Sequence, residues 1–277
     1  MPHVPHALRS TIKPSRANLI HDLKDNVSPD ALKTLNPEAA KSQQPSLPTE
    51  SGSTGSKLES YPCITQKPPP AAFANNTSIA SLQVGLGDKI PRWKANTTVN
   101  FAALAHGYPK PELAVLAATK LNEAANEWNA LDLGIHFAWV EKIDDAAFVL
   151  SFAEQRSEGV LAEAFFPSDV DLQTLNVYPA AFRPGTVQYL RNIFLHELGH
   201  VLGLRHEFAP ERERSAKSVQ VGPRNPTSVM GYEFPPRLQA SDIDSTKAFY
   251  QFSGKELGVR QGRGARGVPL RIVDFSV

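Results

Sequence analysis

The sequence predicts an α+β fold, because segments rich in strand-forming residues alternate with segments that have helical periodicity. Apolar residues recur at helical spacing over residues 111–128 and again over residues 187–202. Between these stretches the chain favours β-branched and aromatic residues. The expected order is therefore a strand, a long helix, several strands and a second long helix.

The folded part is expected to begin near Ile90. Its first strand is predicted over residues 93–104, with Thr97-Thr98-Val99-Asn100-Phe101 at the centre. Pro111 then begins the first long helix, since proline is tolerated in a first helical turn. Further strands are predicted at residues 135–140, 147–152, 161–166 and 176–181.

The last predicted helix covers residues 240–252, and the pair Ser241 and Asp244 resembles a capping box at its start. Three regions follow from these elements. Residues 1–75 are predicted to be disordered, because eleven of the 23 prolines fall in the first 70 positions of a turn-rich, weakly hydrophobic segment. Residues 76–253 form the folded domain, and residues 254–277 are read as a flexible tail of glycines and arginines.

The most informative segment lies in the second long helix and just beyond it. His196, Glu197, His200, Gly203 and His206 have the spacing H-E-x-x-H-x-x-G-x-x-H. Residues i and i+4 of a helix lie on one face, so His196 and His200 can share one metal ion. Gly203 is suited to a left-handed turn that ends the helix and returns the chain, which would bring His206 to the same ion.

Three histidine ligands predict a catalytic zinc site, because they leave the fourth tetrahedral position open for water. Bound zinc lowers the pKa of that water. Glu197 follows the first ligand, where its carboxylate can take the proton of the water and pass it to a leaving amine. Two alternatives are a buried helix whose histidines are hydrogen-bonded core residues, and a zinc site without catalysis.

A second segment, Ser228-Val229-Met230-Gly231-Tyr232, lies about two dozen residues after His206. Together with the histidine motif it resembles the metzincin clan of zinc endopeptidases, over roughly residues 88–253. The resemblance implies a twisted, mostly parallel sheet with two long helices, a C-terminal helix, and a Met-turn that carries Met230 beneath the zinc. It also makes residues 76–253 the catalytic domain.

Details of the motifs resemble two branches of the clan. Glu207 directly after His206, and Tyr232 two residues past Met230, are similar to the astacins. That similarity implies that Tyr232 can ligate zinc and swing away to stabilise the oxyanion; the alternative is a packed tyrosine. Matrixin-like segments occur at residues 125–129, 161–167 and 242–244. Unlike typical astacins, the chain has one cysteine, Cys63, and therefore no intrachain disulfide.

The N-terminal segment suggests a proregion. A thiolate is a good zinc ligand, so Cys63 is one candidate to cap the metal in an inactive form. Asp88 is the other candidate, by its resemblance to the aspartate of astacin proregions. The sequence around each departs from the family motif, and a free cysteine in a disordered linker is the alternative.

The expected partner is a protein or peptide substrate that binds as an added strand. Residues 161–166 match the matrixin edge strand by position, with Phe165 and Phe166 read as core residues and Glu163 as facing the cleft. A peptide-binding module that holds zinc without cleaving, and an amidase acting on a small non-peptide substrate, are the competing functions.

Composition excludes some classes of partner. A net charge of +1 gives no reason to expect nucleic acid binding, and no apolar run approaches the ~20 residues of a membrane span. We expect a monomer. Residues 1–10 lack the apolar core of a signal peptide, so the cytoplasm is the default compartment, and secretion stays open because most of the clan is secreted.

Overall fold

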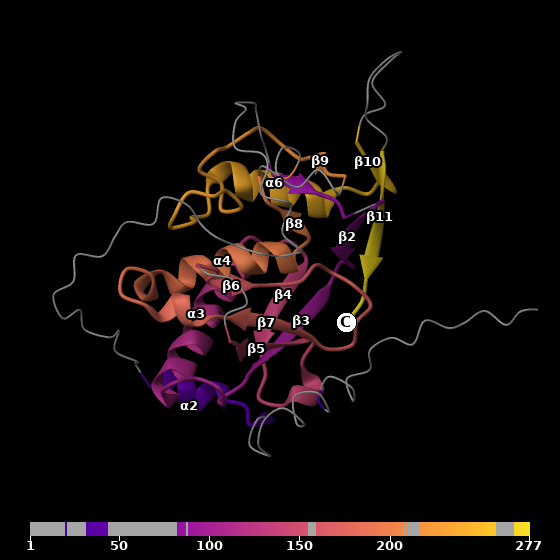
Figure 1. The fold of residues 1–277 in the computed structure, drawn as a ribbon. Helices are drawn as coiled ribbons and strands as arrows, with labels where there is room; N and C mark the ends of the chain where they lie inside the picture. The colour runs from indigo at the N-terminus through magenta and orange to yellow at the C-terminus, as the bar shows by residue number, and fades with distance from the viewer. Residues whose placement is uncertain are drawn as a thin grey trace, which may run out of the picture.

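The computed structural model describes residues 20, 32–43, 82–86, 88–154, 159–207, 209, 217–258 and 269–277. Its largest sheet has five strands in the order β4-β3-β5-β7-β6 (Figure 1). The pairs β3–β4, β3–β5 and β5–β7 are parallel, and only β6 pairs antiparallel with its neighbour. The sheet is thus mostly parallel, as expected. Its strands are β3 (Thr97–Ala103), β4 (Ile135–Trp139), β5 (Phe148–Phe152), β6 (Ala162–Glu163) and β7 (Gln173–Val177).

Two long helices pack against each other and share the main hydrophobic core with the sheet. They are α3 (Pro111–Asn129) and α4 (Leu190–Val201). Trp128 of α3 is fully buried, and its indole N–H donates to Leu195 O of α4 at 3.0 Å. This packing buries the apolar face of α4, so the position of the helix is set by the core.

Smaller elements surround the end of α4. Strand β1 (Gln83–Val84) lies between β8 (Leu204–Arg205) and β9 (Val219–Gln220), antiparallel to both. A second three-stranded sheet has the order β10-β11-β2, in which β11 runs parallel to β2. Its strands are β2 (Lys89–Trp93), β10 (Glu256–Leu257) and β11 (Leu270–Phe275). The last helix is α6 (Ala240–Gln251).

Several predicted boundaries are wrong. The strand predicted over residues 93–104 is two strands in different sheets, because Asn96 has a φ of 64° in a turn between β2 and β3. The strand predicted over residues 176–181 is β7, which ends at Val177 before a short 3-10 helix (Pro179–Phe182). The capping box of α6 consists of Gln239 and Asp242 instead of Ser241 and Asp244.

Both terminal regions contain ordered elements that the sequence did not indicate. Within residues 1–75, helix α2 (Pro37–Ser42) follows a bridge between Thr34 and Leu104. Within residues 254–277, β10 and β11 are strands, so the prediction of a flexible tail is wrong for them. Backbone hydrogen bonds to a distant strand fix β11 and the residues just before α2, and local composition carries no signal of such pairing. None of the described helices is long and apolar enough to cross a membrane.

Candidate metal centre

The three motif histidines come together in one buried cluster. The Nε2 atoms of His196 and His200 are 3.1 Å apart, and each histidine of the trio offers a ligand nitrogen within 4.8 Å of the others. Zn–N bonds of about 2.0–2.1 Å would place two nitrogens of a tetrahedral site about 3.3 Å apart. The exposed fractions of His196, His200 and His206 are 0%, 0% and 3%. The cluster therefore fits a zinc ion.

A left-handed turn at Gly203 brings His206 back to the helix. Gly203 has a φ of 90°, and its N–H donates to His200 O at 2.8 Å. A Cβ at this position would run into the carbonyl oxygen of Pro91, so both the conformation and the space require glycine. The turn predicted from the sequence is confirmed.

Backbone carbonyls orient the two helical histidines. Nδ1 of His196 bonds to Val229 O, and Nδ1 of His200 bonds to Leu204 O, both at 2.7 Å. A carbonyl oxygen only accepts, so Nδ1 carries the proton and the lone pair lies on Nε2, which faces the centre of the cluster. Burial, reinforced by neighbouring His206, holds the pKa of both imidazoles well below the usual range. Both rings are therefore neutral, as metal ligands must be.

Two further predicted site residues lie beside the histidines. Glu197 is fully buried in α4, directly after His196. The ring of half-buried Tyr232 lies with its centroid 5.2 Å from that of His206. Glu197 is therefore next to a histidine of the trio along the helix, and the Tyr232 ring contacts another histidine of the trio.

The segment that the resemblance identifies as the Met-turn packs against α4 through Met230. Met230 is fully buried, and its sulfur packs so closely on Gly199 that a Cβ there would overlap it. The backbone N–H of Glu207 donates to Met230 O at 2.9 Å. One end of the segment after His206 is therefore tied to the turn that carries Met230.

Two buried carboxylates hold the backbone in and just before the Met-turn, and the sequence interpretation gave neither of them this role. Asp242 Oδ2 accepts hydrogen bonds from Val229 N at 2.8 Å and Gln239 N at 2.9 Å. Glu207 Oε1 accepts one from Asn225 N at 2.9 Å. Burial raises the pKa of Asp242 and raises that of Glu207 to about 7. The sequence marked these two residues only through resemblance, Glu207 to the astacins and Asp242 to the matrixins.

The residues proposed to cap the metal or to line the cleft differ in where the structure places them. Cys63 lies outside the described residues, and Asp88 is exposed in the turn before β2. Glu163 lies on edge strand β6, where its Oε2 accepts a hydrogen bond from Tyr178 Oη at 2.6 Å. Phe166 is buried with its ring centroid 5.5 Å from that of His200, and Phe165 packs on the core, so both are packing residues as expected.

Comparison with known families agrees with this geometry. Residues 92–213 match the matrixin family model. The match includes the complete histidine motif and ends before the Met-turn. No curated protein matches the chain significantly.

The matrixin match supports a metalloprotease of the metzincin clan, and the fold is the metzincin fold. It does not confirm the astacin-like branch that Glu207 and Tyr232 suggested. Matrixins bind zinc, in agreement with the geometry of the histidine cluster.

Proposed function

We propose that the protein is an endopeptidase that uses one zinc ion, held by His196, His200 and His206, to hydrolyse peptide bonds. The observation that carries the proposal is the buried trio of imidazoles whose ligand nitrogens lie within 4.8 Å of one another. A structural zinc site has four protein ligands, whereas this cluster supplies three. A bound zinc ion would supply Lewis acidity toward water and toward the substrate carbonyl.

Glu197 is the proposed general base and acid. Its carboxylate takes a proton from the attacking water and returns it to the amine that leaves. Its place directly after a ligand, within a rigid and buried helix turn, supports this role. A fixed carboxylate needs no rearrangement before the proton transfer.

Tyr232 is the proposed donor to the substrate. Its phenol O–H can stabilise the negative charge that develops on the carbonyl oxygen as the tetrahedral intermediate forms. Contact with the His206 ring supports this position. A further role as a metal ligand that moves aside on substrate binding is part of the same proposal.

Substrate is proposed to bind along β6 as an additional strand. Strand β6 is at the edge of the five-stranded sheet and pairs with β7 on one side. Packing of Phe166 on His200 places the segment that follows β6 beside the metal cluster. Backbone hydrogen bonds from an extended peptide would then bring a scissile bond toward the histidines.

A quenched-peptide library with the full chain tests the proposal. We expect cleavage that a chelator abolishes and zinc restores. Glu197→Gln should reduce kcat by about 10²–10⁴-fold while one zinc per chain stays bound, because the base is lost and the ligands are not. Glu112→Ala, on the exposed first turn of α3, is the matched control.

Each outcome discriminates between functions. Stoichiometric zinc with no cleavage of any peptide would overturn the endopeptidase proposal in favour of a zinc-containing binding module. Cleavage confined to small amides would favour an amidase. Unchanged turnover of Glu197→Gln would show that another group is the base.

A further inference from the structure

The turn that follows α4 does two things for the metal cluster. It returns the chain so that His206 reaches the other histidines, and its Leu204 carbonyl orients His200. A shift of residues 201–204, which are the last residue of α4 and the turn after it, would move both ligands together. The elements that hold the turn therefore bear on the geometry of the proposed zinc site.

Strand β2 contacts this turn through two residues, Pro91 and Trp93. The carbonyl of Pro91 packs on Gly203, where no Cβ would fit. The indole N–H of Trp93 donates to Val201 O at 2.7 Å, and Trp93 is 2% exposed. A donor from a buried, rigid side chain thus satisfies one of the carbonyls that the end of a helix leaves without an intrahelical partner.

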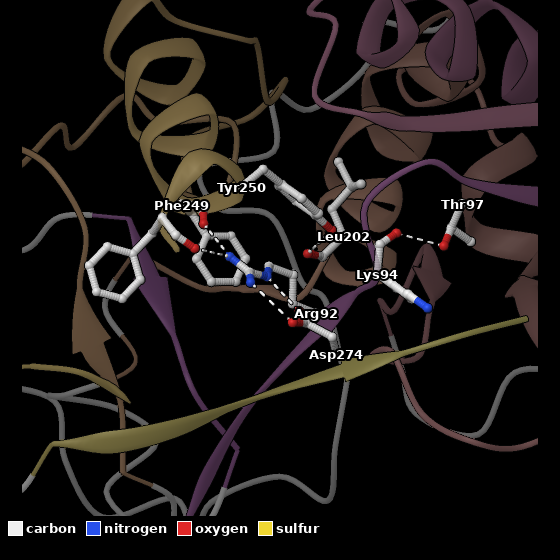
Figure 2. A network of polar contacts seen from close by, with 8 residues as sticks. Arg92, Lys94, Thr97, Leu202, Phe249, Tyr250 and Asp274 are labelled. Carbon is white, nitrogen blue, oxygen red and sulfur yellow. Dashed lines mark hydrogen bonds and ion pairs between the residues drawn. The ribbon is translucent and has the colours of Figure 1, made fainter. Parts of the chain in front are cut away.

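Helix α6 satisfies the next carbonyl. Tyr250 Oη donates to Leu202 O at 2.9 Å, as Figure 2 shows. Burial raises the pKa of the Tyr250 phenol above its usual range, so the hydroxyl stays a donor at any physiological pH. Val201 O and Leu202 O are therefore held by two different elements.

Arg92 links those elements to the C-terminal strand. Its guanidinium donates to both carboxylate oxygens of Asp274 on β11, at 2.7 and 3.2 Å. It also donates to Phe249 O at 2.8 Å, near the end of α6 (Figure 2). A further bond runs to Phe252 O at 2.9 Å, directly after the helix. The parallel register pairs Asp274 with Arg92, so this contact follows directly from the pairing of β11 with β2.

We propose that Arg92, Trp93, Tyr250 and Asp274 form a brace that fixes the turn after α4, and that Tyr250 is a positioning residue for the metal ligands. The proposal rests on the proposed function, since it assigns the brace to the same zinc site. It gives the C-terminal strand, which lies outside the matrixin match, a part in metal binding. Loss of the brace should loosen His200 and His206 together.

Zinc release from the full-length protein to an excess of chelator tests the brace. Tyr250→Phe removes one hydroxyl and keeps the ring, so the protein should remain folded. We expect zinc release about 10-fold faster, at the low end of the effect of outer-shell partners on metal affinity. The d–d absorption bands of the cobalt-substituted protein should also shift, because they report ligand geometry.

Two variants and a control complete the experiment. Asp274→Ala should accelerate release about threefold, less than Tyr250→Phe because Asp274 acts through Arg92. Asp274→Asn keeps an acceptor for Arg92 and should therefore release zinc more slowly than Asp274→Ala. Thr97→Val is the matched control, since Thr97 donates to Lys94 O at 2.6 Å beside the brace but does not reach the turn (Figure 2).

Release from Tyr250→Phe within twofold of the unaltered protein, with an unchanged cobalt spectrum and a lower Tm, would overturn the proposal, because the network would then only stabilise the fold. In cleavage assays we expect kcat to fall and KM to stay constant. A protein that binds zinc tightly but cleaves nothing would refute the proposed peptidase function and leave the release measurements on the brace valid.

Discussion

His196 and His200 lie one turn apart on the same helix, yet their rings are held by different parts of the chain. Nδ1 of His200 bonds to Leu204 O, four residues further on, whereas Nδ1 of His196 bonds to Val229 O, 33 residues further on. The first contact belongs to the turn after α4. The second belongs to the Met-turn, which lies much further along the chain.

Helix α6 connects the two supports. Asp242, in its first turn, holds Val229 N of the Met-turn, and Tyr250, near its end, holds Leu202 O in the turn after α4. The local spacing of the motif thus places the ligands, while contacts between distant segments fix the direction of the rings. Experiments that disturb one support and not the other can measure how much each support contributes to zinc binding and turnover.

The largest effect is expected for His206→Ala, which removes the ligand that the turn after α4 provides. Zinc affinity should fall by more than the roughly 10–100-fold that the loss of an outer partner costs. Isothermal titration of zinc into the metal-free protein measures it. A near-normal affinity would show that His206 is not a ligand, which would leave the turn only its contact with His200.

Tyr232→Phe tests the Met-turn side of the site. The variant should keep its zinc and lose about 10²-fold or more in kcat, as expected for one donor to a developing oxyanion. Steady-state kinetics with a quenched peptide, together with metal analysis, gives both values. A wild-type kcat would favour a packed tyrosine with no catalytic role.

Asp242→Ala removes the α6 support of the Met-turn. The N–H groups of Val229 and Gln239 lose their acceptor, and the loss at the buried Val229 donor costs about 1–3 kcal/mol. We also expect a drop of about tenfold in zinc affinity, because Val229 orients His196. Thermal unfolding and zinc titration measure the two effects.

Asp244→Ala is the control for Asp242→Ala, because Asp244 is exposed on the same helix. It should change neither quantity appreciably. Equal losses in both variants would mean that the charge of the helix, and not the contact with Val229, is responsible.

The smallest effect is expected for Met230→Leu. Met230 is buried on Gly199, and a volume-conserving swap of this kind usually costs less than about 1.5 kcal/mol. Zinc affinity should stay within about threefold, since the backbone of the Met-turn holds His196 and leucine leaves that backbone in place. A chemical denaturation curve measures the stability. A large loss of zinc affinity would show that the thioether itself shapes the site.

The sequence was most informative where structure follows from neighbouring residues. The spacing from His196 to His206 and the turn at Gly203 could be predicted because helix geometry and the steric freedom of glycine are local properties. The long helix from Pro111 was also clear from its periodicity. The burial of Trp128 against Leu195 then follows from two apolar faces that have to be covered.

Residues whose contacts are distant along the chain could not be predicted in the same way. Nothing near Asp274 indicates that it pairs with Arg92, 182 positions earlier. The glycines and arginines before β11 have the composition of a flexible tail. This local composition does not indicate that β11 is a strand stabilised by pairing with β2. Asp242 was noted as part of a matrixin-like segment, but its contact with Val229 depends on how α6 packs.

Strand β1 sets a boundary for any shortened form of this protein. Gln83 and Val84 lie between β8, which leads directly into His206, and β9, and both are buried. A cut ahead of Leu82 leaves this small sheet whole, whereas a cut after Val84 takes out its middle strand and exposes both neighbours. Proteolytic trimming from the amino end should therefore stop short of Leu82 in any form that keeps the histidine cluster intact.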